Sequence, residues 1–506
     1  MILNITNLPL KDLEVEVLGL PIFSGISPIK GEIVKLDKAL GGEISRVYNC
    51  GDITGNYKEF TIIYTQGSVA CKRLLFVGLG EKEKFNSDRL RSVVAIMARN
   101  CRRLKKTTFA IYAPEYLGLT PHEFACIVVE GIELGLYKFT RYIQKDWKGK
   151  FKLSSFYLWG KEGDQQDLKE GLKEGQILAK ATNWSRDLVN EPPNILTPTT
   201  FAIKVKEKLS SLPIKVEVFN EKEIKKLGMY AFLAVAKGSG EPPCFVKLTY
   251  QLDPDLPLIA LIGKGVTFDS GGLDLKNHEQ QQQMKGDMAG GASVAGAIMA
   301  LAEMKVKANV VGLIPLCENL PGNIAYKIGD IITTKSGKTV EVMSTDSEGR
   351  LLLADAITFA KELKASVIID IATLTGGIIT ALGHQTSGIM GNSSWLIKQI
   401  IEAGLEEGEY FWELPLFDSY LLQLKSNVAD IRGDGGRPAS PITAGMFLKE
   451  FVDSTTWAHL DIAGTALVDE AIMLYLKNPY FPKEGGTGVG VRTLYRTVKK
   501  INVSLP

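Results

Sequence analysis

The sequence predicts an α/β protein, in which two α/β domains are joined by a helix and the C-terminal domain has a mixed, twisted sheet flanked by helices. Three observations support this prediction. The chain has 506 residues, more than one domain usually holds. In both halves short apolar segments alternate with longer amphipathic ones, the pattern of strands and helices in α/β folds. A polar stretch at 161–166 separates the two halves.

The first domain is predicted to comprise residues 1–165. Its expected elements are strands at Phe60–Tyr64 and Leu74–Val77, a helix at Ser87–Lys105 with Ser87 as its cap, a strand at Phe109–Ala113, a helix at His122–Tyr137 and a strand at Phe151–Trp159. The turn containing Gly78 and Gly80 lacks a third glycine in register, so a dinucleotide site is not expected there. Because this half has no cluster of acids or histidines, a structural or assembly role is expected.

A helix over residues 166–190 is expected to connect the halves and to end before Pro192, because the residue before a proline is biased away from helical backbone. The second domain, residues 191–506, again alternates. Its expected strands are Val216–Phe219, Phe245–Tyr250, Leu258–Ile262, Val310–Pro315, Val340–Met343 and Val367–Ile371, and its expected helices are Ala292–Met304 and Leu351–Lys364.

The most informative segment runs from Ser344 to Arg350. Asp346, Glu348 and Arg350 occupy every second position, and in an extended segment such residues project to one face. The apolar run from Leu351 onward predicts that a buried helix begins just after them. Two carboxylates and a guanidinium at a strand end are costly to bury unless another charge compensates them. They therefore predict a site where the carboxylates bind a hard cation and Arg350 binds an anion.

A second acidic segment lies upstream. The apolar run 257–262 ends in the glycine-rich segment 263–272, which contains Asp269, and Asp287 follows. Such a run predicts a buried strand that delivers its loop to one edge of a sheet. Asp269, Asp287, Asp346 and Glu348 are therefore candidates for one site. Carboxylates suit Mg or Mn, with Zn also compatible, and four of them exceed the needs of one ion.

Two lysines, Lys264 and Lys276, accompany these acids. A lysine can bind a metal only when it is neutral, and a nearby cation lowers its pKa in that direction. A lysine that stays charged can stabilise negative charge developing on a substrate oxygen. The residues offer one candidate for each role.

Several segments resemble the leucyl aminopeptidase (cytosol aminopeptidase) family. They are Asn190–Asn194, Gly263–Gly272, Met284–Met288, Thr345–Leu351, Asp370–Gly376, Ile442–Leu448, Trp457–Gly464 and Thr487–Arg492. Each is weak alone, but they follow the order that the family uses and extend from about residue 185 to the end. Their ordered occurrence makes the resemblance specific, and it implies that the second domain is catalytic.

The resemblance implies two divalent metal ions per subunit, Mn or Zn. It places the metal ligands at Lys264, Asp269, Asp287, Asp346 and Glu348, the two catalytic side chains at Lys276 and Arg350, and an apolar substrate pocket at Met284, Thr373, Gly376, Ala463 and Ala466. Lys276 would stabilise the oxyanion, and Arg350 would hold bicarbonate as a general base. The family also implies a homohexamer. This chain departs from the family's usual residues at Ser344, Ser347 and Ala289.

Composition narrows the classes of function. The formal charge of +2 provides no global field for nucleic acid, and the basic stretches 102–106 and 145–152 are interpreted as solvated faces. Six scattered cysteines and an N-terminus without a signal peptide indicate a cytoplasmic protein. The apolar stretch Val367–Leu382 contains Asp370, so a membrane span is not expected.

The sequence therefore predicts an aminopeptidase that releases N-terminal residues, preferentially leucine and other apolar ones, from peptides with a free N-terminus. Two alternatives remain open. One is a two-metal phosphohydrolase, because similar ions serve in-line displacement. The other is an additional DNA-binding or architectural role of the hexamer, which would use the basic stretches of the first half.

Overall fold

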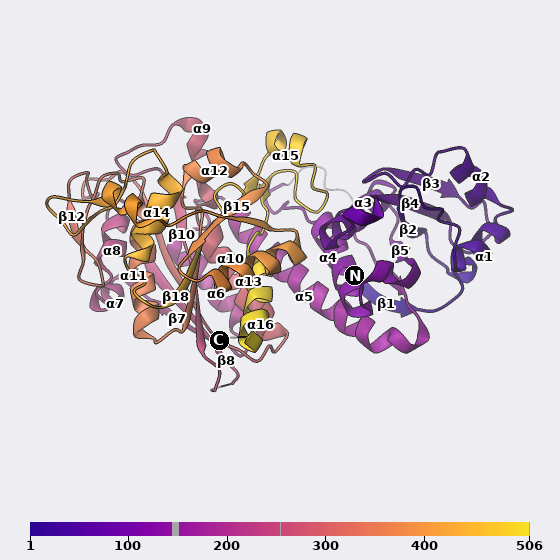
Figure 1. Cartoon of the computed structure of the whole chain (residues 1–506), viewed down its shortest axis with the longest axis horizontal. Coiled ribbons are helices and arrows are strands. Elements are labelled where there is room, and N and C mark those ends of the chain that lie inside the picture. The colour runs from indigo at the N-terminus through magenta and orange to yellow at the C-terminus, as the bar shows by residue number, and fades with distance from the viewer. Residues whose placement is uncertain (144–150, 254, 505–506) are drawn as a thin grey trace. The chain divides into compact units, whose positions relative to one another are not determined.

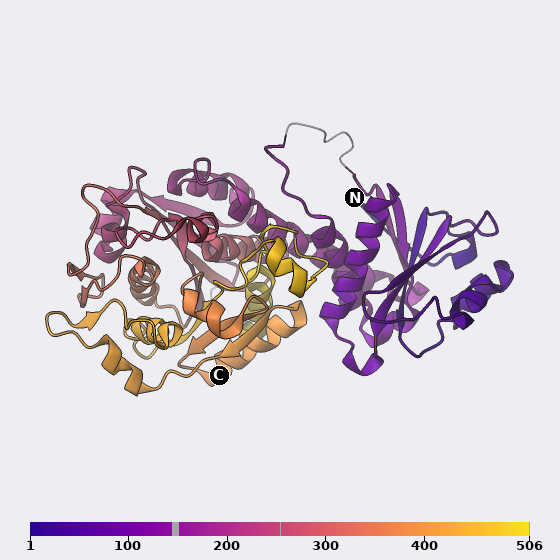
Figure 2. The ribbon, with the colours of Figure 1, turned by 90° about the horizontal axis from the view of Figure 1, so that it is seen from above.

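The computed structural model describes residues 1–143, 151–253 and 255–504 (Figures 1 and 2). Most of the predicted basic stretch 145–152 therefore lies outside the described residues. The chain forms two compact units, of which the first comprises residues 1–180 and 477–482 and the second residues 181–476 and 483–506. The sequence did not predict that a short segment from the C-terminal half joins the first unit.

The first unit contains a sheet with strand order β1-β6-β5-β2-β4-β3, in which β3 is antiparallel to β4 and the other pairs are parallel. Its strands are β1 (Ile2–Thr6), β2 (Val17–Phe23), β3 (Phe60–Tyr64), β4 (Arg73–Gly80), β5 (Thr108–Ile111) and β6 (Ser155–Trp159). Its helices are α1 (Glu32–Ala39), α2 (Glu43–Asn49), α3 (Ser87–Arg103) and α4 (Pro121–Leu136). The predicted elements of this half are present, with ends shifted by a few residues.

Two sequence-based details of the first unit are wrong. Asn86, not Ser87, caps α3, because the Asn86 side chain accepts a hydrogen bond from the backbone N–H of Arg89. Strand β1 and helices α1 and α2 were not predicted. Strand β2 was also missed, although it pairs with both β4 and β5 in the interior of the sheet. Gly19 and Pro21 obscure it in the sequence, because both residues are normally depleted in central strands.

Helix α5 (Gln165–Asn190) begins in the first unit and ends in the second. The main sheet of the second unit has the order β16-β15-β18-β14-β9-β11-β8-β7, with β10 paired to β11. These strands are β7 (Lys215–Phe219), β8 (Cys244–Gln251), β9 (Leu258–Gly263), β10 (Gly265–Asp269), β11 (Asn309–Asn319), β14 (Val367–Ala372), β15 (Thr386–Gly391), β16 (Tyr410–Glu413) and β18 (Thr456–Asp461). Short strands elsewhere are β12 (Ile331–Thr333), β13 (Thr339–Glu341), β17 (Ile431–Arg432), β19 (Leu467–Val468) and β20 (Gly485–Gly486).

Helices cover both faces of this sheet. They are α6 (Pro198–Leu209), α7 (Glu221–Lys226), α8 (Tyr230–Ala236), α9 (His278–Gln281), α10 (Ala289–Glu303), α11 (Glu348–Glu362), α12 (Gly376–Leu382), α13 (Ser394–Glu407), α14 (Ser440–Lys449), α15 (Glu470–Leu476) and α16 (Val491–Ser504). Successive residues of β11 show the two layers. Val311 and Leu313 belong to the core that contains α8, α11 and α14, whereas Gly312 faces Ile298 of α10. The predicted mixed sheet flanked by helices is confirmed.

The parallel strands β9, β11 and β14 end at the same edge of the sheet. Very close packing brings α10 to this edge, since a Cβ on Gly263 would lie 2.5 Å from the carbonyl oxygen of Gly290. Next in the chain, the backbone of Lys264 donates to the carbonyl of Ile371 and accepts from the N–H of Gly291. The backbone of Lys264 is therefore fixed between β14 and the start of α10.

The predicted extended conformation of residues 346–350 is wrong. Asp346 lies in a turn, and Glu348 is the first residue of α11, so Glu348 and Arg350 both lie in the first turn of a helix. Alternation along a strand therefore does not bring these side chains together. Instead, the bend at the turn orients Asp346 and the helix start orients Glu348.

Asp355, in the middle of α11, holds this helix in place. Its buried carboxylate accepts hydrogen bonds from the backbone N–H groups of Phe232 in α8 and of Lys335 after β12, at 3.0 and 2.7 Å. Burial raises the pKa of Asp355 to about 7, while the backbone donors act in the opposite direction.

None of the helices in the described part of the chain combines the length and apolar character needed to cross a bilayer.

We predict that Asp355→Ala lowers the free energy of unfolding by about 3 kcal/mol, because it leaves two buried backbone donors without an acceptor. The shift of the urea unfolding midpoint measures this effect. Asp453→Ala is the matched control, since that carboxylate is 70% exposed and pairs only with Lys361 among the described contacts. Equal stability of the two variants would contradict the role assigned to Asp355.

Candidate metal centre

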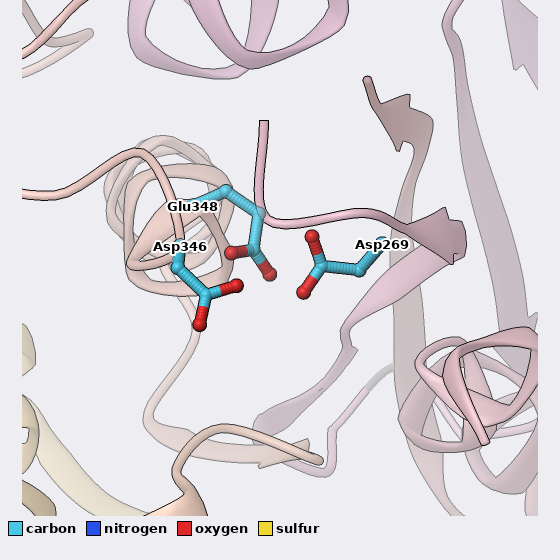
Figure 3. Close-up of side chains that lie close together, drawn as sticks. All are labelled: Asp269, Asp346 and Glu348. Atoms are coloured by element: carbon cyan, nitrogen blue, oxygen red, sulfur yellow. The ribbon is translucent and has the colours of Figure 1, made fainter. Parts of the chain in front are cut away.

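Three carboxylates meet at the carboxyl edge of the second sheet. Asp269 is the last residue of β10, Asp346 lies in the turn before α11, and Glu348 begins that helix. One oxygen from each lies within 4.8 Å of the others, and Figure 3 shows the three groups pointing toward one another. Three converging oxygens are an arrangement that suits a hard cation.

Lys264 joins a fourth carboxylate to this group. Its Nζ lies 2.8 Å from Asp287 and 2.7 Å from Glu348 Oε1, and it donates to the carbonyl of Thr373 at 3.1 Å. The Thr373 hydroxyl also donates to Asp287, at 2.7 Å. Glu348 therefore lies between two sets of groups, with Asp269 and Asp346 on one side and Lys264 and Asp287 on the other.

Lys276 lies on the Asp346 side of the cluster. Its Nζ is 2.8 Å from Asp269 and also contacts Asp346. The structure thus brings together all seven predicted ligand and catalytic residues except Arg350, which lies on the same helix turn as Glu348 but points to other partners.

The cluster has an excess of negative charge. Four carboxylates face two ammonium groups, which leaves two negative charges unbalanced. Burial, together with the charges of Glu348 and Asp269, raises the pKa of Asp346 to about 7, and burial raises the pKa of Asp287 well above its ordinary value. In addition, Glu348 Oε2 is buried without a hydrogen-bond partner. Divalent cations fit this site because they would compensate both the charge and the unpaired oxygen.

The two lysines respond to the same field. Burial lowers the pKa of Lys264 and of Lys276, but the neighbouring carboxylates outweigh it and raise both pKa values above the ordinary range. Both are therefore protonated while the carboxylates dominate. For Lys264 to bind a metal it must release its proton, a change that a cation within the cluster favours.

Gly349 leaves the space that Lys264 occupies. A Cβ at this position would lie 2.7 Å from Lys264 Cε and 2.9 Å from its Nζ. Because the Lys264 ammonium pairs with both Asp287 and Glu348, the side chain cannot move aside without losing one of these ion pairs. Gly349 therefore determines where the ammonium lies.

Several residues that support the cluster were not predicted from the sequence. Asn319, at the end of β11, donates to Asp269 at 2.8 Å and to the carbonyl of Thr345 at 2.9 Å. Asp274 accepts from the Thr345 N–H and from the Ser344 hydroxyl, which itself accepts from the Asp346 N–H. The sequence did contain one signal for Asn319, because a polar residue at the end of a long apolar strand indicates a functional position at the edge of the sheet. Ser344, a departure from the family, thus orients the turn that carries Asp346.

Arg350 is buried and 4% exposed. Its Nη1 donates to the carbonyl of Gly433 at 2.9 Å and lies 3.3 Å from Asp434 Oδ2. The same Asp434 oxygen accepts from the hydroxyl of Ser347 at 2.8 Å. Asp434 was not predicted either, because it lies more than eighty residues from Arg350 in the sequence. Ser347 is the second of the residues at which the resemblance implied another side chain.

A cavity of about 840 Å³ opens beside the cluster. Asp346, Arg350 and Asp434 line it together with apolar side chains that include Leu374 and Ile442. The predicted substrate pocket residues lie at different places. Gly376 lines the cavity, Thr373 follows β14, Met284 precedes Asp287, Ala463 follows β18, and Ala466 is buried and 2% exposed.

An acidic cluster at the edge of an α/β sheet, open to a cavity, is typical of a metal-dependent hydrolase. The chain belongs to the cytosol aminopeptidase family: residues 183–495 match the family's catalytic domain and residues 20–146 its N-terminal domain. This match confirms the resemblance predicted from the sequence. The protein is a metallo-aminopeptidase.

Individual relatives agree with this assignment. The chain is 38% identical to the probable cytosol aminopeptidase of Alkaliphilus metalliredigens (strain QYMF) over 505 residues, covering 98% of this chain and 99% of the relative. It is 43% identical to that of Geotalea uraniireducens (strain Rf4) over 464 residues, covering 91% and 92%.

Two solved structures are similar over nearly the whole chain. The bottromycin maturation enzyme BotP in complex with Mn has a TM-score of 0.84 and 31% identity, covering 96% of this chain and 100% of its own. A mutant of tomato leucine aminopeptidase has a TM-score of 0.86 and 29% identity, covering 99% and 96%. These similarities confirm the predicted α/β fold class.

We predict that Gly349→Ala weakens metal binding by about 10- to 100-fold, the usual effect of disturbing groups that orient a metal site. Metal content after dialysis against limiting Mn measures this effect. Gly240→Ala is the matched control, because a Cβ there would meet no atom within 4 Å. Unchanged metal affinity in a folded Gly349→Ala protein would contradict the assignment of Lys264 to the metal centre.

Proposed function

We propose that this protein is a leucyl aminopeptidase that uses two divalent ions, Mn or Zn, to release leucine and other apolar residues from the N-termini of peptides. The observation that carries the proposal is the unbalanced negative charge of the carboxylate cluster beside a cavity with apolar walls. A relative solved with Mn supports the choice of Mn.

The arrangement of the cluster supports a division of the ligands between two ions. Asp269, Asp346 and Glu348 would hold one ion, since their oxygens already converge. Lys264 and Asp287, on the other side of Glu348, would help to hold the second. Divalent ions bound in this way supply Lewis-acid activation of the scissile carbonyl and of the attacking water.

The two ions would also explain a preference for a chain end. A peptide's free α-amine would be held by one of the ions, whereas an internal peptide bond offers no such group. Leu374 and Ile442 provide apolar surface for the first side chain. The pocket of Met284, Thr373, Gly376, Ala463 and Ala466, which the resemblance implies, belongs to this proposal.

Two positive side chains would act during the reaction. Lys276, held charged by Asp269 and Asp346, would stabilise the developing oxyanion. Arg350 would hold the anion that accepts the proton of the attacking water. Bicarbonate, which the resemblance implies for this position, would have to share the guanidinium with Asp434.

We extend the proposal to a cytoplasmic homohexamer. Its support is the resemblance to the family. Among the described residues, the first unit contains no group of acids comparable to the cluster of the second unit.

We predict that protein stripped of metal is inactive on leucyl-p-nitroanilide and regains activity when Mn or Zn is added. The initial rate of anilide release measures this. A phosphate monoester, tested in parallel, is the control for a two-metal phosphohydrolase. Hydrolysis of the ester without hydrolysis of the anilide would refute the proposal.

We further predict different behaviour of the two lysine variants. Lys276→Ala should retain both ions but lose about 100-fold or more in turnover, because an oxyanion stabiliser is missing. Lys264→Ala should lose metal affinity and recover in part with excess Mn, since a ligand is missing. Metal analysis and turnover measured together decide this. If Lys276→Ala loses metal and Lys264→Ala keeps it, the roles are reversed.

A further inference from the structure

Arg350 already has an anion from its own chain. Its buried Nη1 lies 3.3 Å from the carboxylate of Asp434 and donates to the carbonyl of Gly433. Asp434 therefore occupies a position beside Arg350 at which a small anion would otherwise bind.

Two further hydrogen bonds hold the Asp434 carboxylate. Ser347, which lies between Asp346 and Glu348 in the chain, donates its hydroxyl to Oδ2 at 2.8 Å. The backbone N–H of Gly436 donates to Oδ1 at 2.6 Å. Each carboxylate oxygen thus has a donor, so the group is oriented rather than free to turn.

The carboxylate also reaches the reaction cavity. The Asp434 side chain is 20% exposed, and it lines the same cavity as Asp346 and Arg350. Because Ser347 is flanked by two candidate metal ligands, its bond to Asp434 places the carboxylate next to the loop that carries them. Asp346 and Asp434 thus both lie in the wall of this cavity.

A bicarbonate ion beside Arg350 would face the negative charge of Asp434. Bicarbonate and a carboxylate are both planar anions that present two oxygens to a guanidinium. A second anion would meet the negative charge of Asp434 and also of Glu348, Asp346 and Asp461, which already act on Arg350. Like charges at such short range repel strongly in a site with restricted access to water.

We propose that Asp434 is a catalytic residue that replaces bicarbonate as the general base. As the water oxygen bonds to the scissile carbonyl carbon, its proton passes to Asp434. When the C–N bond breaks, that proton passes to the leaving nitrogen and regenerates the carboxylate. No further reactant is required. This inference rests on the proposed aminopeptidase function.

A purely structural role for Asp434 has a different signature. If Asp434 only held Arg350 in place, Asp434→Asn would preserve most of the activity, because its amide oxygen can stay beside Arg350 and accept from Ser347, and only the bond from the Gly436 N–H is lost. As a base, however, a neutral amide is ineffective. Asp434→Ala instead removes the side chain and leaves room beside Arg350 for bicarbonate.

The experiment compares wild type, Asp434→Asn and Asp434→Ala in carbon dioxide-free buffer with and without added bicarbonate, with metal content measured for each. We expect wild-type turnover to be independent of bicarbonate and both variants to retain metal but to lose about 100-fold or more in turnover. Added bicarbonate should restore Asp434→Ala by about 10-fold or more but not Asp434→Asn. Asp418→Asn, an exposed change in the same unit, is the control.

A binding measurement gives an independent readout. Isotope-labelled bicarbonate should bind to Asp434→Ala but not to wild type, as followed by nuclear magnetic resonance. Wild type that binds or requires bicarbonate, near-normal turnover of Asp434→Asn, or loss of metal from either variant would each overturn the inference. Wild type that hydrolyses no leucyl substrate when loaded with metal would instead refute the proposed function.

Discussion

An unbalanced negative charge at the carboxyl edge of the second sheet is the constraint on which the rest of the site depends. Four carboxylates from three separate segments converge where only two ammonium groups are present. Such a group is unfavourable to bury without compensation. Divalent cations would supply this compensation in the proposed function.

Close backbone packing makes this convergence sterically feasible. Gly263 allows α10 to approach the end of β9, and Gly349 leaves the space that the Lys264 side chain occupies. Asn319 and Asp274 then tie the loops together, the first through Asp269 and the second through the turn before Asp346. The carboxylates are therefore oriented by a polar framework, which lowers the cost of organising them when a cation binds.

The two serines that depart from the family's usual residues have defined partners. Ser344 connects Asp274 to the backbone of Asp346, and Ser347 connects the same loop to Asp434. The second contact links Ser347 to the neighbour of Arg350. The role of Ser347 can thus be understood only together with a residue on a distant loop.

Local patterns were sufficient to predict the fold class, the family and part of the second unit, namely β7, β8, β9, β11, β13, β14, α10 and α11, because apolar periodicity and ordered motifs are local properties of the chain. No element after Ile371 was predicted. All seven candidate ligand and catalytic residues were assigned to one site, and the structure brings six of them together, although the predicted extended conformation at Glu348 is wrong. Only the tertiary structure decided that Asn319 contacts Asp269 and that Asp434 contacts Arg350. These pairs are distant in sequence, and their contact depends on strand order and loop paths, which local patterns do not encode.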